Sequence, residues 1–190
     1  MKSIKMPFAL ELADRNKMRL IMSRIIIVIG LFFSGLVAAE EQWWSYLSSQ
    51  ENGPSSTRVD LRFNKLAPVT DYPFVMVTGI TYEKLNTEGL PGPNQIDSLN
   101  KLQEALVSYL ESKIPIKYVG TFTYQNEQLH YIYVQNKEEA EQALNSFYST
   151  HCQDRKPYIN VKQDPEWARY KQFLYPSKQI IEYYGLVINE

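Results

Sequence analysis

Few residues of this sequence carry side chains that could act as a nucleophile or a general base. The two histidines are His130 and His151, and the single cysteine, Cys152, directly follows His151. Cysteine and histidine can form a nucleophile–base pair, but such pairs are normally assembled from positions far apart in the sequence. Neighbouring side chains usually point in different directions. We therefore interpret Cys152 as a structural thiol at a helix end, with an intermolecular disulfide as the alternative.

His130 is the other candidate for chemistry. It lies in Leu129–Val134, a stretch rich in β-branched and aromatic residues that predicts a strand. A histidine in such a strand is usually structural, which is our preferred interpretation. An alternative hypothesis is a hydrolase-type enzyme whose site brings His130 together with Asp60 and Glu83.

Metal and cofactor sites are not indicated by the sequence. A zinc site needs several converging His, Cys or carboxylate ligands, and only two histidines and one cysteine are present. The glycines of Gly89–Pro93 alternate with prolines, which cannot donate hydrogen bonds to a phosphate. Glu138, Glu139 and Glu141 read as the solvated face of a helix. We assign no catalytic residue, no metal and no cofactor.

Aromatic residues are the unusual abundance, with 14 tyrosines in the chain. Tyr131 and Tyr133 have a spacing of two and therefore point to the same face of their strand. Tyrosine is favoured both in strands and at interfaces, so these rings either form a partner surface or belong to the core. We take a set of residues as candidates for binding: His130, Tyr131, Tyr133, Trp167 and Tyr170.

The elements that must position these residues follow from hydrophobic periodicity. Residues 57–63 alternate as a half-buried strand, and 72–82 is an almost continuously apolar strand. Helices are predicted over 96–110 and after Asn136, which can cap the second helix. Further strands are predicted over 117–124, 129–134 and 157–161. This order predicts an α+β fold, a ferredoxin-like βαββαβ sandwich with one extra N-terminal strand.

A short C-terminal aromatic helix is predicted after the last strand. Asp164 is a good N-cap, Pro165 suits the first helical position, and Pro176 ends the helix. Trp167 and Tyr170 share a face of this helix at a spacing of three. Their rings are expected either to pack on the sandwich or to line a groove for a ligand or partner.

The first 39 residues differ from the rest and predict a secretory signal peptide. Basic residues precede an apolar run over 25–39, and Val37 and Ala39 occupy the positions that a signal peptidase reads. A retained membrane anchor is the alternative, although the run is shorter than the roughly 20 residues of a spanning helix. We expect residues 40–190 to form a single domain that is periplasmic or secreted.

Charge excludes one class of partner. Residues 40–190 carry 14 Lys/Arg and 19 Asp/Glu, a net charge of −5. Binding to a phosphate backbone relies on basic patches, so no nucleic-acid partner is expected. The same balance gives no reason to expect a membrane partner after signal cleavage.

The C-terminal segment also carries a family resemblance. Its residues Asp164–Trp167, Tyr170 and Phe173–Pro176 resemble the signature of the bacterial family called domain of unknown function 695. Weaker elements occur in the same order: Trp44, Asp60, Tyr72-Pro73, Gly89–Pro91 and Val119–Thr121. That family is similar in pattern to the ribonuclease E inhibitor B family, whose fold is ferredoxin-like. The resemblance implies a fold and no reaction.

These observations favour a secreted or periplasmic, non-enzymatic binding or interaction module whose partner is another protein. The alternatives are the hydrolase with a site around His130 and a structural homodimer formed through the tyrosine-bearing sheet face.

Overall fold

The computed structural model describes residues 42–153 and 155–187, and residues 41–190 form one compact unit. The predicted signal peptide, 1–39, lies outside the described residues. Within the described part, no helix is long and apolar enough to cross a membrane.

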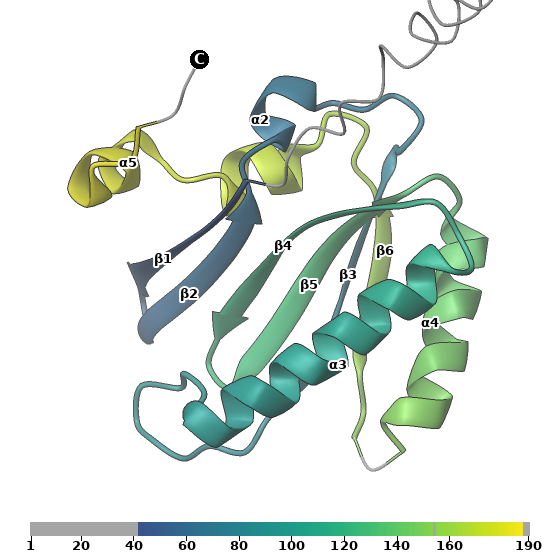
Figure 1. Cartoon of the computed structure of the whole chain (residues 1–190), viewed down its shortest axis with the longest axis horizontal. Coiled ribbons are helices and arrows are strands. Elements are labelled where there is room, and N and C mark those ends of the chain that lie inside the picture. The colour runs from purple at the N-terminus through teal and green to yellow at the C-terminus, as the bar shows by residue number, and fades with distance from the viewer. Residues whose placement is uncertain (1–41, 154, 188–190) are drawn as a thin grey trace, which may run out of the picture. The chain divides into compact units, whose positions relative to one another are not determined.

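The centre of the unit is a mixed α/β structure around a six-stranded sheet in the order β1-β2-β4-β5-β3-β6, with every neighbouring pair antiparallel (Figure 1). The strands are β1 (Trp43–Gln50), β2 (Gly53–Asp60), β3 (Phe74–Thr81), β4 (Ile116–Tyr124), β5 (Glu127–Val134) and β6 (Tyr158–Gln163). The strands predicted over 117–124 and 129–134 are confirmed as β4 and β5, although β5 begins two residues earlier, at Glu127. They form a hairpin whose two turn residues, Gln125 and Asn126, are both at positive φ.

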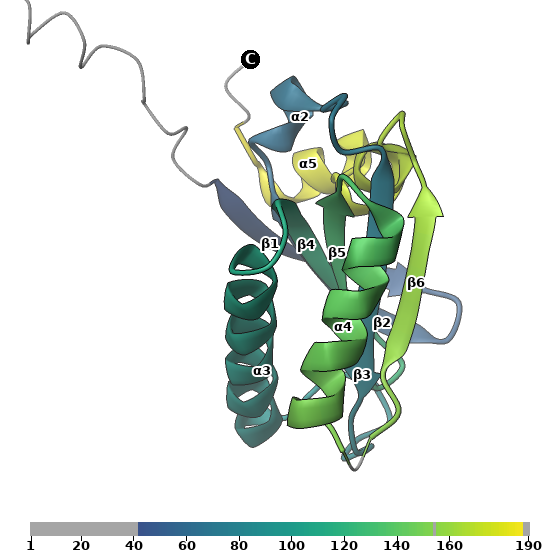
Figure 2. The same cartoon turned by 90° about the vertical axis from the view of Figure 1, so that its right-hand side faces the viewer.

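Two long helices, α3 (Pro93–Glu111) and α4 (Lys137–His151), lie side by side on one face of the sheet (Figures 1 and 2). The predicted cap of α4 is confirmed, because the Asn136 side chain accepts a hydrogen bond from the Glu139 backbone N–H at 3.1 Å. Between these helices and the sheet lies the first core. Its most buried members include Met76, Leu106, Leu110, Ile132, Leu144 and Phe147.

The opposite face of the sheet is also covered, and this second core is largely aromatic. Three short helices contribute: α2 (Phe63–Leu66), the π-helix η1 (Arg169–Leu174) and α5 (Lys178–Tyr184). Figure 1 shows α2 and α5 in the upper part of the view, on the side of β1 and β2. The core beneath them is formed by Tyr46, Val59, Phe63, Val75, Val119, Tyr131, Tyr133, Trp167, Tyr170 and Leu174.

The N-terminal part of the fold differs from the prediction of one extra strand over 57–63. The structure has a two-stranded hairpin, β1 and β2, and Phe63 begins α2. The alternation that predicted the strand is real for Val59, which is fully buried. The prediction failed before residue 57, because the turn lies at residues 51–52 and β2 begins at Gly53, which pairs with Gln50 at a φ of 129° that favours glycine.

The C-terminal aromatic helix is present but starts later than predicted. Residues 164–167 form a turn, and η1 follows from Arg169. Asp164 still satisfies the helix start: its carboxylate accepts the Ala168 N–H at 2.8 Å and the Arg169 N–H at 2.9 Å. Tyr133 on β5 donates its hydroxyl to the same carboxylate at 2.6 Å. One buried acid therefore joins the segment to the sheet.

Trp167 shows why the helix starts late. Its φ of 57° is in the left-handed region, which an aromatic residue adopts only where surrounding contacts compensate. Its ring stacks on Tyr133 with a centroid separation of 3.8 Å and an interplanar angle of 5°. Its Nε1–H donates to the Tyr72 carbonyl at 3.0 Å. Tertiary contacts thus override the local preference for a continuous helix.

Removing the Tyr133 hydroxyl should destabilise the fold. In Tyr133→Phe, Asp164 loses a donor and the Tyr170 N–H, 3.2 Å from that hydroxyl, loses its acceptor. We expect the free energy of unfolding to fall by about 1–3 kcal/mol, measured by urea denaturation. Tyr175→Phe is the control, because the Tyr175 hydroxyl makes no hydrogen bond to another described residue. Equal stability of the two variants would contradict the role of this network.

Candidate functional site

The five residues that the sequence nominates for binding all lie in the interior, none exposing more than 6% of its surface. Tyr133, Trp167 and Tyr170 come together in the second core. Tyr131 lies beside them, with its ring 5.6 Å from that of Phe173. His130 points to the other face, toward α3. Binding of a partner by these rings stays a prediction. Because η1 covers them, a partner would contact them only by reaching beneath η1.

His130 sits in a small polar cluster beneath α3. The Thr121 hydroxyl donates to Gln103 Oε1 at 3.3 Å, so its oxygen is left to accept from Tyr118 and from His130 Nδ1, which is 3.2 Å away. Burial lowers the pKa of His130 to about 4 and raises that of Tyr118 to about 12. At neutral pH the imidazole is uncharged.

The structure does not bring His130 together with Asp60 and Glu83. The shift of the His130 pKa comes from burial with no contribution from a carboxylate. The Asp60 carboxylate is bound by Arg62, with 2.6 Å between Asp60 Oδ2 and an Arg62 guanidinium nitrogen. Glu83 is exposed at the rim of a separate cavity. The hydrolase hypothesis therefore finds no acid–base pair at His130.

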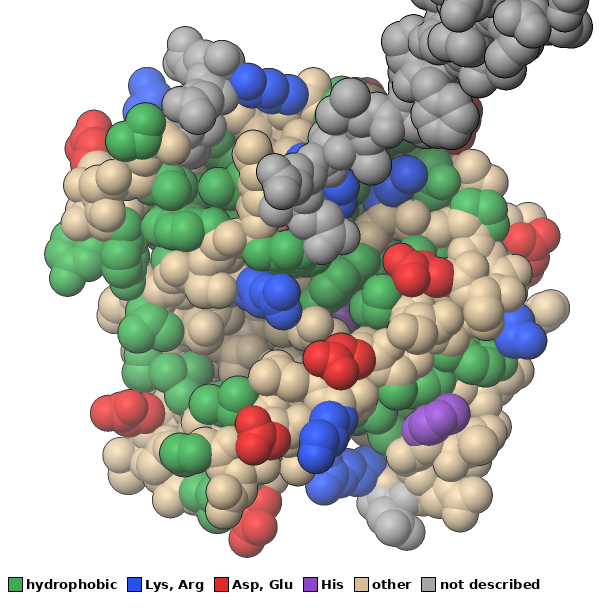
Figure 3. All heavy atoms as spheres, in the orientation of Figure 1, with side chains coloured by type: hydrophobic (Ala, Val, Ile, Leu, Met, Phe, Trp, Pro, Cys, Tyr) green, Lys and Arg blue, Asp and Glu red, His purple; other side chains and the backbone are tan. Residues whose placement is uncertain are grey.

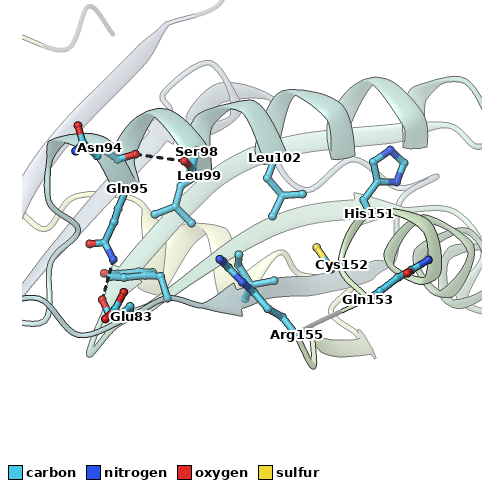
Figure 4. A pocket seen from close by; sticks show the side chains of 12 residues that line it. Glu83, Asn94, Gln95, Ser98, Leu99, Leu102, His151, Cys152, Gln153 and Arg155 are labelled. Carbon is cyan, nitrogen blue, oxygen red and sulfur yellow. Dashed lines mark hydrogen bonds between the residues drawn. The ribbon is translucent and has the colours of Figure 1, made fainter.

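Glu83 belongs to a cavity of about 480 Å³ between α3 and the end of α4, which we call the α4 pocket (Figure 4). Its floor is apolar, with Ile80, Tyr82, Leu99 and Leu102. Figure 4 shows Glu83 and Arg155 on different sides of its polar rim. Gln95, on the rim, is already bonded to the Glu83 carbonyl through Nε2 at 2.8 Å.

His151 and Cys152 also line the α4 pocket, and their geometry does not resemble a nucleophile–base pair. His151 Nδ1 lies 3.0 Å from the Phe147 carbonyl, and its ring stacks on Phe147 at 4.3 Å. Burial raises the pKa of the Cys152 thiol, so it stays protonated at neutral pH. The structural interpretation of Cys152 accounts for both features.

A second cavity, of about 340 Å³, lies between α3 and the β1–β2 hairpin, and we call it the polar trough. Figure 3 shows this face as a hollow of mainly uncharged polar atoms beside α3, with hydrophobic side chains at its outer margin. Its lining residues are Ser45, Leu47, Ser56, Arg58, Leu90, Pro91, Ile96, Asn100, Gln103, Thr121, Thr123 and Gln128.

The floor of the trough consists of polar side chains in positions that are normally apolar. Gln103, Thr121, Thr123 and Gln128 are all buried. Neither Thr123 nor Gln128 makes a side-chain hydrogen bond to another described residue. Their polar atoms are not sealed in the protein, so their hydrogen-bonding groups face the trough. Water reaches these groups in the free protein, and a ligand with matching donors and acceptors replaces that water.

Sequence reasoning missed the trough, although a signal was present. Thr121 and Thr123 on β4, with Gln128 and His130 on β5, occupy alternate positions that face α3. Polar residues at inward-facing strand positions are informative, because such positions are usually apolar. The missing information was the β1–β2 hairpin, which extends the sheet beyond α3 and leaves this polar strip open.

The fold and the two cavities define a mixed α/β protein with a six-stranded antiparallel sheet and a polar trough at one side of α3. Comparison with known families matches residues 41–175 to the group described as a family of unknown function, DUF695. Because the match covers most of the chain, the protein belongs to this family. Searches of curated proteins and of solved structures found no match. Similarity in pattern to the ribonuclease E inhibitor B family stays a prediction.

The burial of His130 predicts a specific loss of stability in acid. An unfolded histidine titrates near 6.5, whereas the folded pKa is about 4, so the unfolded chain binds the extra proton between these values. The contribution of His130 to the free energy of unfolding is therefore constant above pH 6.5. It falls by roughly 3 kcal/mol as the pH falls from 6.5 toward 4. Below pH 4 it changes little further.

Urea denaturation between pH 7.5 and 4 measures this loss. His130→Gln is the matched variant, because it keeps a hydrogen-bonding group and removes the titration. We expect the free energy of unfolding of the wild type to decline more steeply than that of His130→Gln. Parallel pH profiles of the two proteins would mean that proton uptake by His130 in the unfolded chain does not cause the loss of stability in acid.

Proposed function

We propose that this protein is a secreted or periplasmic, non-enzymatic binding module of ferredoxin-like architecture, and that the polar trough holds its protein ligand. The architecture is supported by the order β4-β5-β3-β6 within the sheet. It is also supported by the connections, since α3 joins β3 to β4 and α4 joins β5 to β6. Both helices pack on the same face, as the βαββαβ arrangement requires.

Binding in the trough rests on one observation: the side chains of Thr123 and Gln128 on its floor have hydrogen-bonding groups that face the cavity and pair with no other described residue. The amides of Asn100, Gln103 and Gln128 each offer donors and an acceptor, which complement the N–H and C=O of a peptide group. These groups favour an extended polypeptide as the ligand.

The margin of the trough favours apolar residues in that polypeptide and disfavours basic ones. Leu47, Leu90 and Ile96 supply apolar contacts, and Leu47 is 53% exposed. Arg58 is the charged side chain in the lining, and its guanidinium lies 4.6 Å from the Trp43 ring centre. We therefore propose an apolar, extended segment of another envelope protein, without basic residues, as the ligand.

Peptide selection tests this assignment. Residues 41–190 are used to select from a phage-displayed library of random peptides, and affinities of the selected peptides are measured by fluorescence polarisation. We expect apolar sequences without lysine or arginine to be enriched. A Thr123→Val/Gln128→Leu variant should bind them at least about tenfold more weakly, since it removes two hydrogen bonds of about 1 kcal/mol each.

Gln153→Leu is the control, because it makes the same glutamine change in the α4 pocket. It should leave affinity unchanged. Enrichment that is insensitive to the trough variant, or preferential binding of neutral oligosaccharides on a glycan array, would overturn the proposed peptide ligand.

Export is the second part of the proposal and has its own test. The full chain with a C-terminal tag is expressed in a bacterial host, and the N-terminus of the tagged product is determined by mass spectrometry. We expect a periplasmic product that begins at Glu40. Ala39→Trp should block cleavage, whereas Ala38→Trp should not, because the peptidase reads the small residues on either side of position 38. An uncleaved cytoplasmic product of the wild type would contradict export.

A further inference from the structure

β1 forms one outer edge of the sheet and lacks the usual protection of an edge strand. Its sequence, Trp43–Gln50, contains no charged residue and no proline. Edge strands carry outward-facing N–H and C=O groups that can pair with another chain, and proteins commonly block them with lysine or proline. β1 is covered in a different way.

A side-chain hydroxyl group from α5 binds the edge of β1. The Leu47 N–H donates to the Tyr184 hydroxyl at 3.1 Å, and the same hydroxyl donates to the Leu47 carbonyl at 3.2 Å. Leu47 is near the middle of β1, and these two backbone groups point away from β2. The Tyr184 ring is also placed edge-on against Trp44, with 5.6 Å between ring centres. α5 therefore occupies the position that a pairing strand would take.

α5 is held by few contacts. No residue of the helix is buried, and Ile180 packs only partly against the second core. The helix also lies beyond residue 175, where the match to the family ends. Tyr183 is 83% exposed, and it shares with Leu47 an open groove of about 700 Å³ between α5 and β1. Displacing α5 thus disturbs little of the core.

We propose that the edge of β1 is a pairing surface for β1 of a second copy of this chain, and that α5 keeps this surface closed. Antiparallel pairing about a two-fold axis at Leu47 matches the Leu47 N–H and C=O with the same groups of the other copy. The two backbone groups that Tyr184 now satisfies would then be satisfied by the partner.

The sequence of β1 makes a second copy the fitting occupant. In this register Ser45 lies opposite Ser49, and no like charges meet, because the strand is uncharged. Leu47 lies opposite itself and adds apolar contact at the axis. This surface is separate from the tyrosine-bearing face of the sheet, which η1 covers. It shares Leu47 with the polar trough, but the pairing uses the backbone of β1 and does not require a ligand in the trough.

The test compares two tyrosines in the same helix. Tyr184→Ala removes the hydroxyl and the ring that cover β1, and Tyr183→Ala makes the same change at an exposed ring whose hydroxyl bonds no other described residue. Sedimentation velocity over a range of concentrations measures self-association of residues 41–190. We expect Tyr184→Ala to dimerise with a dissociation constant at least about tenfold lower than those of the wild type and Tyr183→Ala.

Two further measurements locate the contact. Leu47→Lys in the Tyr184→Ala background places lysine opposite lysine and should restore the monomer. Amide hydrogen exchange at residues 45–49 of Tyr184→Ala should be fast at low concentration and slow when the protein dimerises. The proposal is overturned if Tyr184→Ala associates no more strongly than Tyr183→Ala, or if its dimer persists with Leu47→Lys.

Discussion

The buried Asp164 carboxylate is the contact on which the second half of the structure depends. It receives the Tyr133 hydroxyl from the middle of the sheet and the first N–H groups of the C-terminal helix. A buried charge is tolerated only when hydrogen bonds replace its hydration, and these donors provide that replacement. Because the donors come from two distant segments, satisfying the acid also fixes the aromatic segment on the sheet.

That attachment changes the role of the sheet face. Tyr131 and Tyr133 point away from α3 and α4. From the sequence, these rings were expected either to form a partner surface or to belong to the core. The C-terminal segment covers this side, and Tyr170 reaches across it to donate its hydroxyl to the Asp60 carbonyl at 2.9 Å. Burial raises the pKa of Tyr170, as expected for a phenol removed from water. The domain thus has two cores, without a disulfide among its described residues.

The open surfaces lie where the added hairpin extends past the long helices. β1 and β2 widen the sheet, but α3 stays over β4 and β5, so one strip of polar side chains is left uncovered. The same extension creates the edge at β1 that Tyr184 covers. Both proposed contact regions are consequences of one structural feature, the N-terminal hairpin, and they meet at Leu47, which lines the trough and the groove under α5.

The sequence by itself determined the local elements whose signals are short-range. The helices α3 and α4, the Asn136 cap and the strands β4 and β5 depend on patterns of residues a few positions apart, and these predictions are confirmed. The tertiary structure decided the rest. Trp167 leaves helical geometry because a ring 34 positions earlier stacks on it, and Thr123 becomes part of a trough because β2 pairs with β4. Such contacts join segments distant in sequence, and their free energy exceeds the small local preferences that a sequence pattern reveals.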